Sequence, residues 1–189
     1  MPRESGRRDE LLAAATDFVL EHGLIGLSLR PLAAALGTSD RMLLYHFAGK
    51  DDLVAAVLHR SNDRSIAIIE ALPAAGSVHA EVLALWAAAT SAELARCQRL
   101  YVEAAALGLL GREPYRSVVR EANRAWGGAL GRRLVAAGMT PGRADRAVAL
   151  LDAAVMGFQL DLPVQDRSVL EQVVRDLARA VVTIAEGSV

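Results

Sequence analysis

The chain has 189 residues, of which 53% are hydrophobic and only 4% aromatic, and its formal net charge is −1. This length is enough to bury a substantial core, and the abundance of alanine, leucine, arginine and glutamate favours helices over strands. The charge argues against a strong general affinity for nucleic acid, so any attraction to phosphate must come from the placement of individual residues.

The chain carries no signal for export or for a membrane. The single cysteine, Cys97, cannot form an internal disulfide, and the sequence opens MPRESGRRDE, without an apolar leader. The longest apolar runs, residues 82–89 and 153–160, fall short of the roughly 20 residues that a membrane span needs. We therefore expect a soluble protein of the reducing cytoplasm.

Residues 8–22 predict the first helix, because their apolar side chains repeat at helical spacing and the run ends before His22 and Gly23. The stripe consists of Leu11, Leu12, Ala15, Phe18 and Val19. We expect this helix to support the segment that follows it.

Residues 28–50, SLRPLAAALGTSDRMLLYHFAGK, predict two short helices joined at a sharp turn. Ser28 is placed to cap the first helix and Pro31 lies in its first turn, where a missing N–H costs little. Gly37 follows where that helix must stop, since glycine adopts the left-handed conformation easily. Thr38 and Ser39 then offer a cap for the second helix. This pattern is typical of a helix-turn-helix unit, which places a helix in the major groove of DNA.

The remaining chain predicts six longer helices, for a total of about nine. We expect them at residues 50–72, 78–94, 97–110, 115–137, 141–160 and 166–185. Glycine, proline or acidic first-turn residues mark most of their ends. The last two helices carry apolar stripes too broad for a helix that buries a single face. These stripes are Ala147, Leu150, Leu151, Ala154, Val155 and Phe158, and then Leu170, Val173, Val174, Leu177, Val181 and Ile184.

Residues 7–60 resemble the N-terminal DNA-binding region of TetR-type transcriptional regulators. The matching positions are Ser28, Arg30, Leu32, Ala33, Gly37, Leu43, His46, Phe47, Lys50 and Leu53. The pattern departs at Leu44, where the family usually has a tyrosine that contacts phosphate; here Tyr45 follows instead. The resemblance implies an all-α fold with a helix-turn-helix DNA-binding domain at residues 1–49 and a ligand-binding and dimerisation domain at residues 50–189. It also implies a homodimer formed through the last two helices; the alternative is that both stripes are core of a monomer.

Ten residues are candidates for contact with double-stranded DNA: Ser28, Arg30, Thr38, Ser39, Asp40, Arg41, Met42, Tyr45, His46 and Lys50. Arg41 suits a bidentate bond to guanine, Asp40 suits a cytosine amino group, and Met42 suits a thymine methyl. Ser28, Arg30 and Lys50 suit phosphate. Each role has a structural alternative: a solvated arginine for Arg41, a helix cap for Asp40, core packing for Met42, and a packed ring for Tyr45 or His46.

The resemblance further implies a pocket for a small-molecule effector in the larger domain. The bulky candidates for its wall are Trp86, Tyr101, Tyr115, Trp126, Met156 and Phe158. At helical spacing such residues are more often part of the core than of a pocket wall. Scarce aromatic residues and many alanines favour an aliphatic cavity and an apolar or amphipathic ligand. No motif predicts a cofactor, a metal site or a catalytic residue.

These observations predict a ligand-responsive transcriptional regulator, most simply a repressor that binds a palindromic operator as a homodimer and is released by a small molecule. Two alternatives stay open. One is a helical adaptor that uses its apolar surfaces for protein partners. The other is an enzyme that uses Cys97, whose neighbours Arg96 and Arg99 favour a thiolate.

Overall fold

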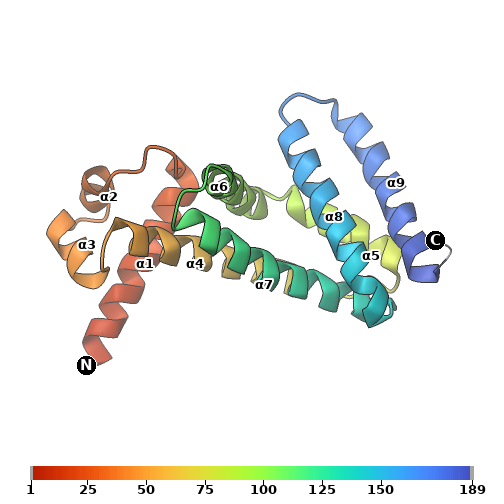
Figure 1. The fold of residues 1–189 in the computed structure, drawn as a ribbon, viewed down its shortest axis with the longest axis horizontal. Helices are drawn as coiled ribbons and strands as arrows, with labels where there is room; N and C mark the ends of the chain where they lie inside the picture. Colours follow the sequence, from red (N-terminus) through yellow and green to blue (C-terminus); the bar gives the residue numbers. More distant parts are fainter. Residues whose placement is uncertain (1, 188–189) are drawn as a thin grey trace. The chain divides into compact units, whose positions relative to one another are not determined.

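The computed structural model describes residues 2–187, with side chains from residue 6 onward, and this part of the chain forms nine α-helices and no strand (Figure 1). The helices are α1 (Pro2–His22), α2 (Leu29–Ala35), α3 (Asp40–His46), α4 (Lys50–Glu70), α5 (Val78–Ala89), α6 (Ala92–Leu109), α7 (Tyr115–Ala136), α8 (Pro141–Asp161) and α9 (Arg167–Glu186). The predicted all-α class is confirmed.

The helices pack into two compact units. The first contains the chain up to residue 65 together with residues 92–123, and the second contains residues 66–91 together with the chain from residue 124. Helices α4 and α7 therefore run from one unit into the other. The predicted boundary between residues 49 and 50 divides the chain by function, and it stays a prediction.

In the first unit, α6 is tied to the end of α1 by two charged side chains one turn apart. The Arg99 guanidinium donates to the carbonyl of Leu20 at 2.6 Å, and the Glu103 carboxylate accepts from the amides of Leu24 at 2.6 Å and Ile25 at 2.9 Å. These bonds satisfy backbone groups left free where a helix ends. They fix the loop that leads from α1 into α2.

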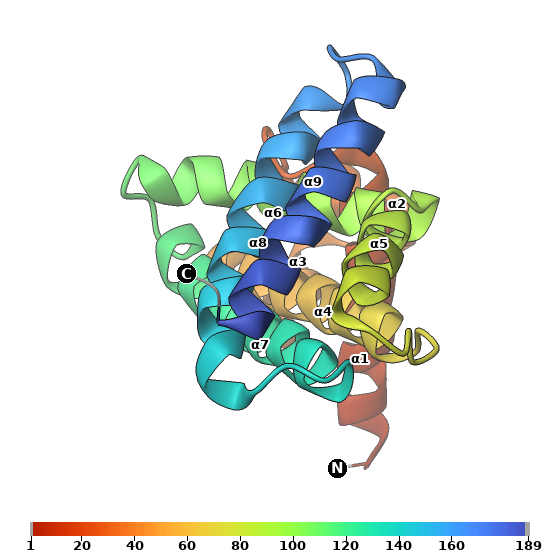
Figure 2. The ribbon, with the colours of Figure 1, turned by 90° about the vertical axis from the view of Figure 1, so that its right-hand side faces the viewer.

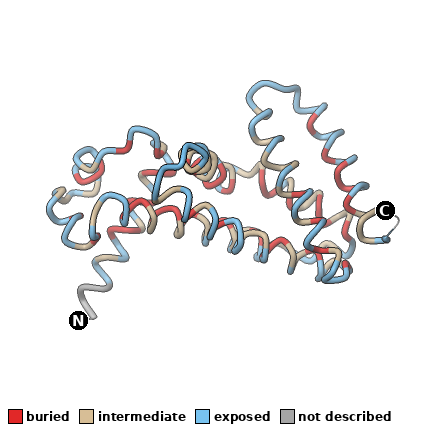
Figure 3. The backbone as a smooth tube through the Cα atoms, viewed as in Figure 1, coloured by how far each residue is buried: buried red, intermediate tan, exposed pale blue. Residues whose placement is uncertain are grey.

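In the second unit, α9 lies between α8 and α5 (Figure 2). Its buried side chains follow one stripe: Leu170, Val174, Leu177, Ala178 and Val181. Along the tube of Figure 3, buried and exposed residues alternate on this helix as expected for one covered face. Val169 and Val173 lie to one side of this stripe and are exposed. Within one chain, α9 thus buries only part of its predicted apolar stripe.

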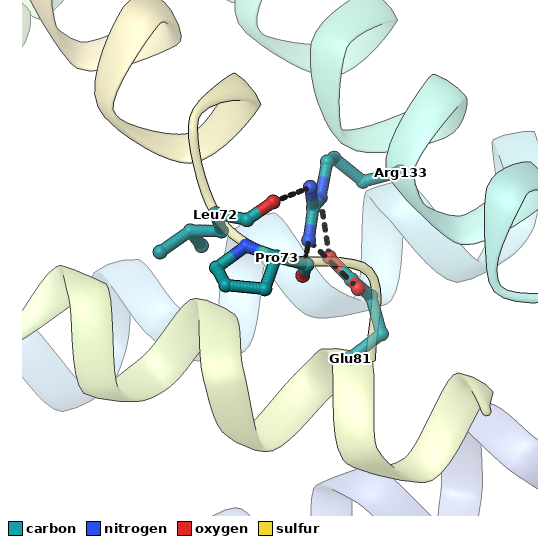
Figure 4. Close-up of polar contacts among 4 residues, drawn as sticks. All are labelled: Leu72, Pro73, Glu81 and Arg133. Carbon is teal, nitrogen blue, oxygen red and sulfur yellow. Dashed lines mark hydrogen bonds and ion pairs between the residues drawn. The ribbon is translucent and has the colours of Figure 1, made fainter. Parts of the chain in front are cut away.

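A buried ion pair closes the connection between α4 and α5 (Figure 4). Arg133 on α7 donates to both carboxylate oxygens of Glu81, at 2.6 and 3.0 Å, and the two side chains are only 12% and 2% exposed. The same guanidinium donates to the carbonyls of Leu72 at 2.6 Å and Pro73 at 2.9 Å. A buried charge is tolerated only when it is paired and hydrogen-bonded, and both partners meet that condition here.

Three predicted helix boundaries are wrong. Helix α1 begins at Pro2 and not at residue 8, α5 ends at Ala89 and not at residue 94, and α6 begins at Ala92 and not at residue 97. At the end of α5 the Thr90 hydroxyl donates back to the carbonyls of Trp86 at 3.2 Å and Ala87 at 3.1 Å. This side chain satisfies the last carbonyls where no glycine or proline marks a stop. Among the described helices, none combines the length and apolar character of a membrane span.

Candidate nucleic-acid interface

The turn between α2 and α3 has the predicted glycine geometry. Gly37 adopts a left-handed conformation with φ of 62°. The amide of Thr38 donates to the carbonyl of Ala33 at 2.9 Å, and that of Gly37 donates to the carbonyl of Ala34 at 3.1 Å. This pair of bonds is a Schellman motif, which ends one helix and lets the next begin within three residues.

The capping of α2 and α3 differs from the prediction. Ser28 holds the N-cap position of α2, but its side chain makes no capping bond. Pro31 stands at the third helical position and has no N–H, so an amide that a cap would bind is missing. On α3 the cap is Ser39, whose hydroxyl accepts from the amide of Met42 at 3.3 Å. Asp40 is therefore a first-turn acid and not the cap.

Helix α3 presents one face to solvent and buries the other. Leu43 and Phe47 are fully buried, as their spacing predicts. Arg41 is exposed, Met42 is 44% exposed and Tyr45 is 68% exposed. The core alternatives for Met42 and Tyr45 are thereby wrong, and these three side chains share the outward face of the helix.

Two residues near α3 have roles that we did not predict. Leu44 is 47% exposed and is a second apolar group that α3 leaves open to solvent, on a different side of the helix from Met42. The available signal was that Leu44 lies outside the buried pair of Leu43 and Phe47. Arg8 on α1 donates to the carbonyl of His46 at 3.2 Å and lies 4.7 Å from the Phe47 ring centroid. It holds the end of α3 against α1, a long-range contact with no local signal in the sequence.

The candidate phosphate groups gather where α2 and α4 begin. The Lys50 ammonium donates to the carbonyl of Leu27, directly before Ser28. Ser28 and Arg30 are both exposed. An ammonium carries three donors, so this one bond leaves donors for a further acceptor. His46 is half-buried, and its ring lies edge-on to that of Tyr45 with 5.1 Å between centroids. The His46 side chain is therefore partly packed and partly open to solvent.

Four of the six candidate pocket residues lie in the second unit. Trp86 on α5 meets Phe158 on α8 edge-to-face, with ring centroids 5.7 Å apart. The indole Nε1 of Trp126 on α7 donates to Asp152 on α8 at 3.0 Å. Met156 lies between Asp152 and Phe158 along α8, and all five side chains are half-buried. The structure thus brings these residues to adjoining parts of three helices.

Tyr101 and Tyr115 belong to the first unit and are half-buried there. Burial raises the pKa of the Tyr115 hydroxyl, and the negative charge of Asp51 adds to this shift. Gln98, also in this unit, is buried, and its Oε1 has no hydrogen-bond partner among the described residues. In the second unit, burial raises the pKa of Asp152, while the bond from Trp126 lowers it.

Comparison with protein families decides the identity of the first helices. Residues 11–57, which span most of α1, all of α2 and α3 and the start of α4, match the model of the bacterial regulatory proteins of the TetR family. The chain belongs to the TetR family of transcriptional regulators. TetR-family proteins are DNA-binding regulators and not enzymes, which confirms both predictions for this chain.

Solved structures of transcriptional regulators and of a multidrug-binding protein share the fold over nearly the whole chain. A transcriptional regulator from Rhodococcus sp. RHA1 is 23% identical with a TM-score of 0.75, covering 93% of this chain and 96% of that one. A TetR-family member from Streptomyces coelicolor A3 is 26% identical with a TM-score of 0.66, covering 93% and 97%. The multidrug-binding protein EbrR in complex with proflavin is 27% identical with a TM-score of 0.68, covering 93% and 99%. A search of curated protein sequences finds no match.

The thiol of Cys97, which suggested an enzyme, is not exposed to solvent in this TetR-family chain. Cys97 is buried in α6, and the guanidinium of Arg99 is bound to the carbonyls of Leu20 and Glu21. Within the described residues, no three side chains of His, Cys, Asp or Glu gather in a way that suits a metal ion. The exposed face of α3 remains the best-defined candidate site.

Proposed function

We propose that this TetR-family regulator is a repressor that binds a palindromic operator as a homodimer and leaves it when a small molecule binds the second unit. The observation that carries the proposal is the outward face of α3, where Arg41, Met42 and Tyr45 are exposed on a helix that the family uses in DNA. A regulator that acts on DNA works in the cytoplasm of a bacterium.

Base reading is assigned to α3. Arg41 binds guanine through both guanidinium donors, and Met42 contacts a thymine methyl group. Asp40, at the start of the helix, accepts from a cytosine amino group, and Thr38 and Ser39 contact the backbone beside it. Helices of this size contact only a few base pairs, so the specificity of one head is low.

Phosphate binding is assigned to both ends of the helix-turn-helix unit. Lys50, Ser28 and Arg30 lie within a short stretch around the start of α2 and hold one phosphate, supported by the uncapped amides of that helix. The family's usual phosphate-binding tyrosine is replaced by Leu44 here, and the hydroxyl of the next residue, Tyr45, contacts the phosphate in its place. The His46 ring donates to phosphate beside it. These contacts set the position of the head without reading sequence.

Dimerisation is assigned to α8 and α9. Leu150, Ala153, Gly157 and Leu160 are exposed on α8 at alternating spacings of three and four, which is the spacing of a helix-packing seam. A side chain added at Gly157 would meet nothing within 4 Å, so this position leaves space for a helix of a second chain. Val169 and Val173 extend the apolar surface onto α9. An exposed apolar surface of this kind is typical of a protein interface.

Effector binding is assigned to the second unit. EbrR is named as a multidrug-binding protein and has been solved with proflavin and ethidium. Here Trp86, Trp126, Met156 and Phe158 are half-buried side chains around α8. Helix α4 starts directly after α3 and continues into the second unit, which provides a covalent route between the sites. Effector and DNA then weaken each other's binding by the same free energy.

Selection of bound fragments from random double-stranded DNA, at near-physiological salt, tests this proposal. We expect an enriched palindrome bound by a dimer, as measured by light scattering of the purified complex. Arg41→Ala is the matched variant and should lose the enrichment at one position of each half-site. A folded protein that enriches no sequence would contradict operator reading and support the adaptor alternative.

A further inference from the structure

Helix α8 changes character after Leu151. Ala144, Ala147 and Leu151 are fully buried, whereas no residue from 152 to 162 is buried. This second half is still rich in apolar residues, with the sequence DAAVMGFQLDL. The second half of α8 therefore leaves its apolar side chains only partly covered within one chain.

The half-buried face of this segment points toward α5 and α7. Asp152, Met156 and Gln159 are spaced by four and three and therefore share one face of α8. Asp152 accepts from Trp126 of α7 at 3.0 Å, and the Gln159 side-chain amide donates to the carbonyl of Ala89 of α5 at 3.2 Å. The rise from residue 152 to residue 159 is about 10 Å, which is the length of a tricyclic aromatic molecule.

Asp152 is the one acidic side chain on this face. Burial raises its pKa, and the Trp126 indole is the only hydrogen-bond donor to it among the described residues. No lysine, arginine or histidine of the described chain pairs with it. A carboxylate that loses part of its water without gaining a cation is unfavourable. Glu81, the buried acid of this unit, has Arg133 as its partner, whereas the half-buried Asp152 has no cation.

We infer that the α8 face bordered by Trp126 and Trp86 binds an organic cation with a flat apolar body, with the Asp152 carboxylate as its counter-charge. The cation would provide the charge that the protein itself does not supply to Asp152. Indole and phenyl rings attract cations through their faces, so Trp86, Trp126 and Phe158 suit the same ligand. An anion would be repelled by the Asp152 carboxylate and would find no basic residue on this face to bind it. The inference names the effector class of the function proposed above and rests on it.

Two tricyclic probes of opposite charge test the inference: acridine orange, a cation, and 9-anthracenecarboxylate, an anion. Isothermal titration calorimetry on the full-length protein should detect the cation and not the anion. Asp152→Asn keeps the size of the side chain and an oxygen for Trp126, and it should weaken the cation by about 10- to 100-fold, as expected for loss of a charged partner. Asp145→Asn removes an exposed carboxylate from the same helix and should bind like the wild type.

The outcomes separate the ligand class from the regulatory role. Equal affinity of wild type and Asp152→Asn, or binding of the anion as tight as that of the cation, would overturn the inference. The inference would also be overturned if the wild-type protein bound no cation but still selected its operator. In that case the repressor proposal would stand. Cation binding that depends on Asp152 but leaves operator affinity unchanged would support the site and contradict its role as the effector site. Thermal melting of each variant checks that it folds.

Discussion

The proposed bond of Arg41 to guanine is the role that a single replacement tests most directly. Arg41 is exposed on α3, and a bidentate bond to a base needs the paired donors of its guanidinium. Arg41→Ala should weaken operator binding by about 1–3 kcal/mol and relax the preference at one base pair of each half-site. Competition among single-base operator variants measures both effects. Arg30→Ala is the matched control and should weaken all variants equally; an unchanged base preference in Arg41→Ala would exclude the assigned role.

Lys50 should act on all DNA sequences alike. Lys50→Met keeps most of the apolar stem and removes the ammonium that binds the Leu27 carbonyl and, in our proposal, a phosphate. We expect a uniform loss of affinity and a salt dependence shallower by about one ion per head. Titrations at several salt concentrations measure the slope. A loss confined to one operator variant would show that Lys50 reads bases, and a melting curve monitors the loss of the bond to Leu27.

Asp152 gives stability a defined pH dependence. Burial raises its pKa in the folded state, so the folded protein holds this proton more tightly than the unfolded chain. Its contribution to stability is therefore complete below the unfolded pKa of about 4 and is lost as the pH rises through the folded pKa. Asp152→Asn should melt above the wild type at pH 7, by no more than about 2–4 °C because water screens a half-exposed carboxylate. The difference should vanish in acid; a constant difference at all pH values would assign it to packing.

At the scale of elements, the Arg133 and Glu81 pair holds α7, α5 and the end of α4 together. Arg133→Met should reduce the free energy of unfolding by about 3–5 kcal/mol, because it leaves a buried carboxylate without its cation. Chemical denaturation measures the loss. Arg132→Met is the neighbouring control, since its pair with Glu70 is exposed and such pairs contribute about 0–1 kcal/mol. Adding Glu81→Leu to Arg133→Met should recover part of the stability; no recovery would mean that the two carbonyl bonds of Arg133 dominate.

The elements also show which features could be predicted from the sequence. Local signals sufficed for the Gly37 turn, for the buried pair Leu43 and Phe47 and for the number of helices. The predicted end of α5 was wrong because the Thr90 side chain ends that helix without a glycine or proline to mark the position. The contacts of Arg133 join residues more than 50 positions apart, and no local pattern predicts such a pairing.

The candidate site was predictable to the same degree. Helical spacing separated the outward residue Arg41 from the buried Leu43, because a single helix fixes both. The roles of Arg8 and Leu44 depend on what packs against α3, and the contact of Trp126 with Asp152 joins two helices. Tertiary contacts of this kind determine a site as much as the residues that face the ligand.

At the scale of the whole molecule, the function we propose requires two copies of the chain, because one α3 reads too few base pairs for useful specificity. The apolar groups left exposed on α8 and α9 are the surface available for this. Leu160 is 59% exposed and Val164, in the turn after α8, is 77% exposed. In a dimer both would be covered by the second chain, which would bury the second face that the broad apolar stripes predict.

Leu160→Glu tests this surface, because a glutamate there would place an unpaired charge in the interface of each copy. We expect the dimer to weaken by at least about 100-fold, as for a buried charge that costs several kcal/mol. Analytical ultracentrifugation measures the association, and operator competition should show that the palindrome is no longer preferred over a half-site. Leu109→Glu changes another exposed leucine, in the first unit, and should remain dimeric. If Leu160→Glu stays a dimer with full preference for the palindrome, the two copies meet elsewhere, while the reading head on α3 keeps its assigned role.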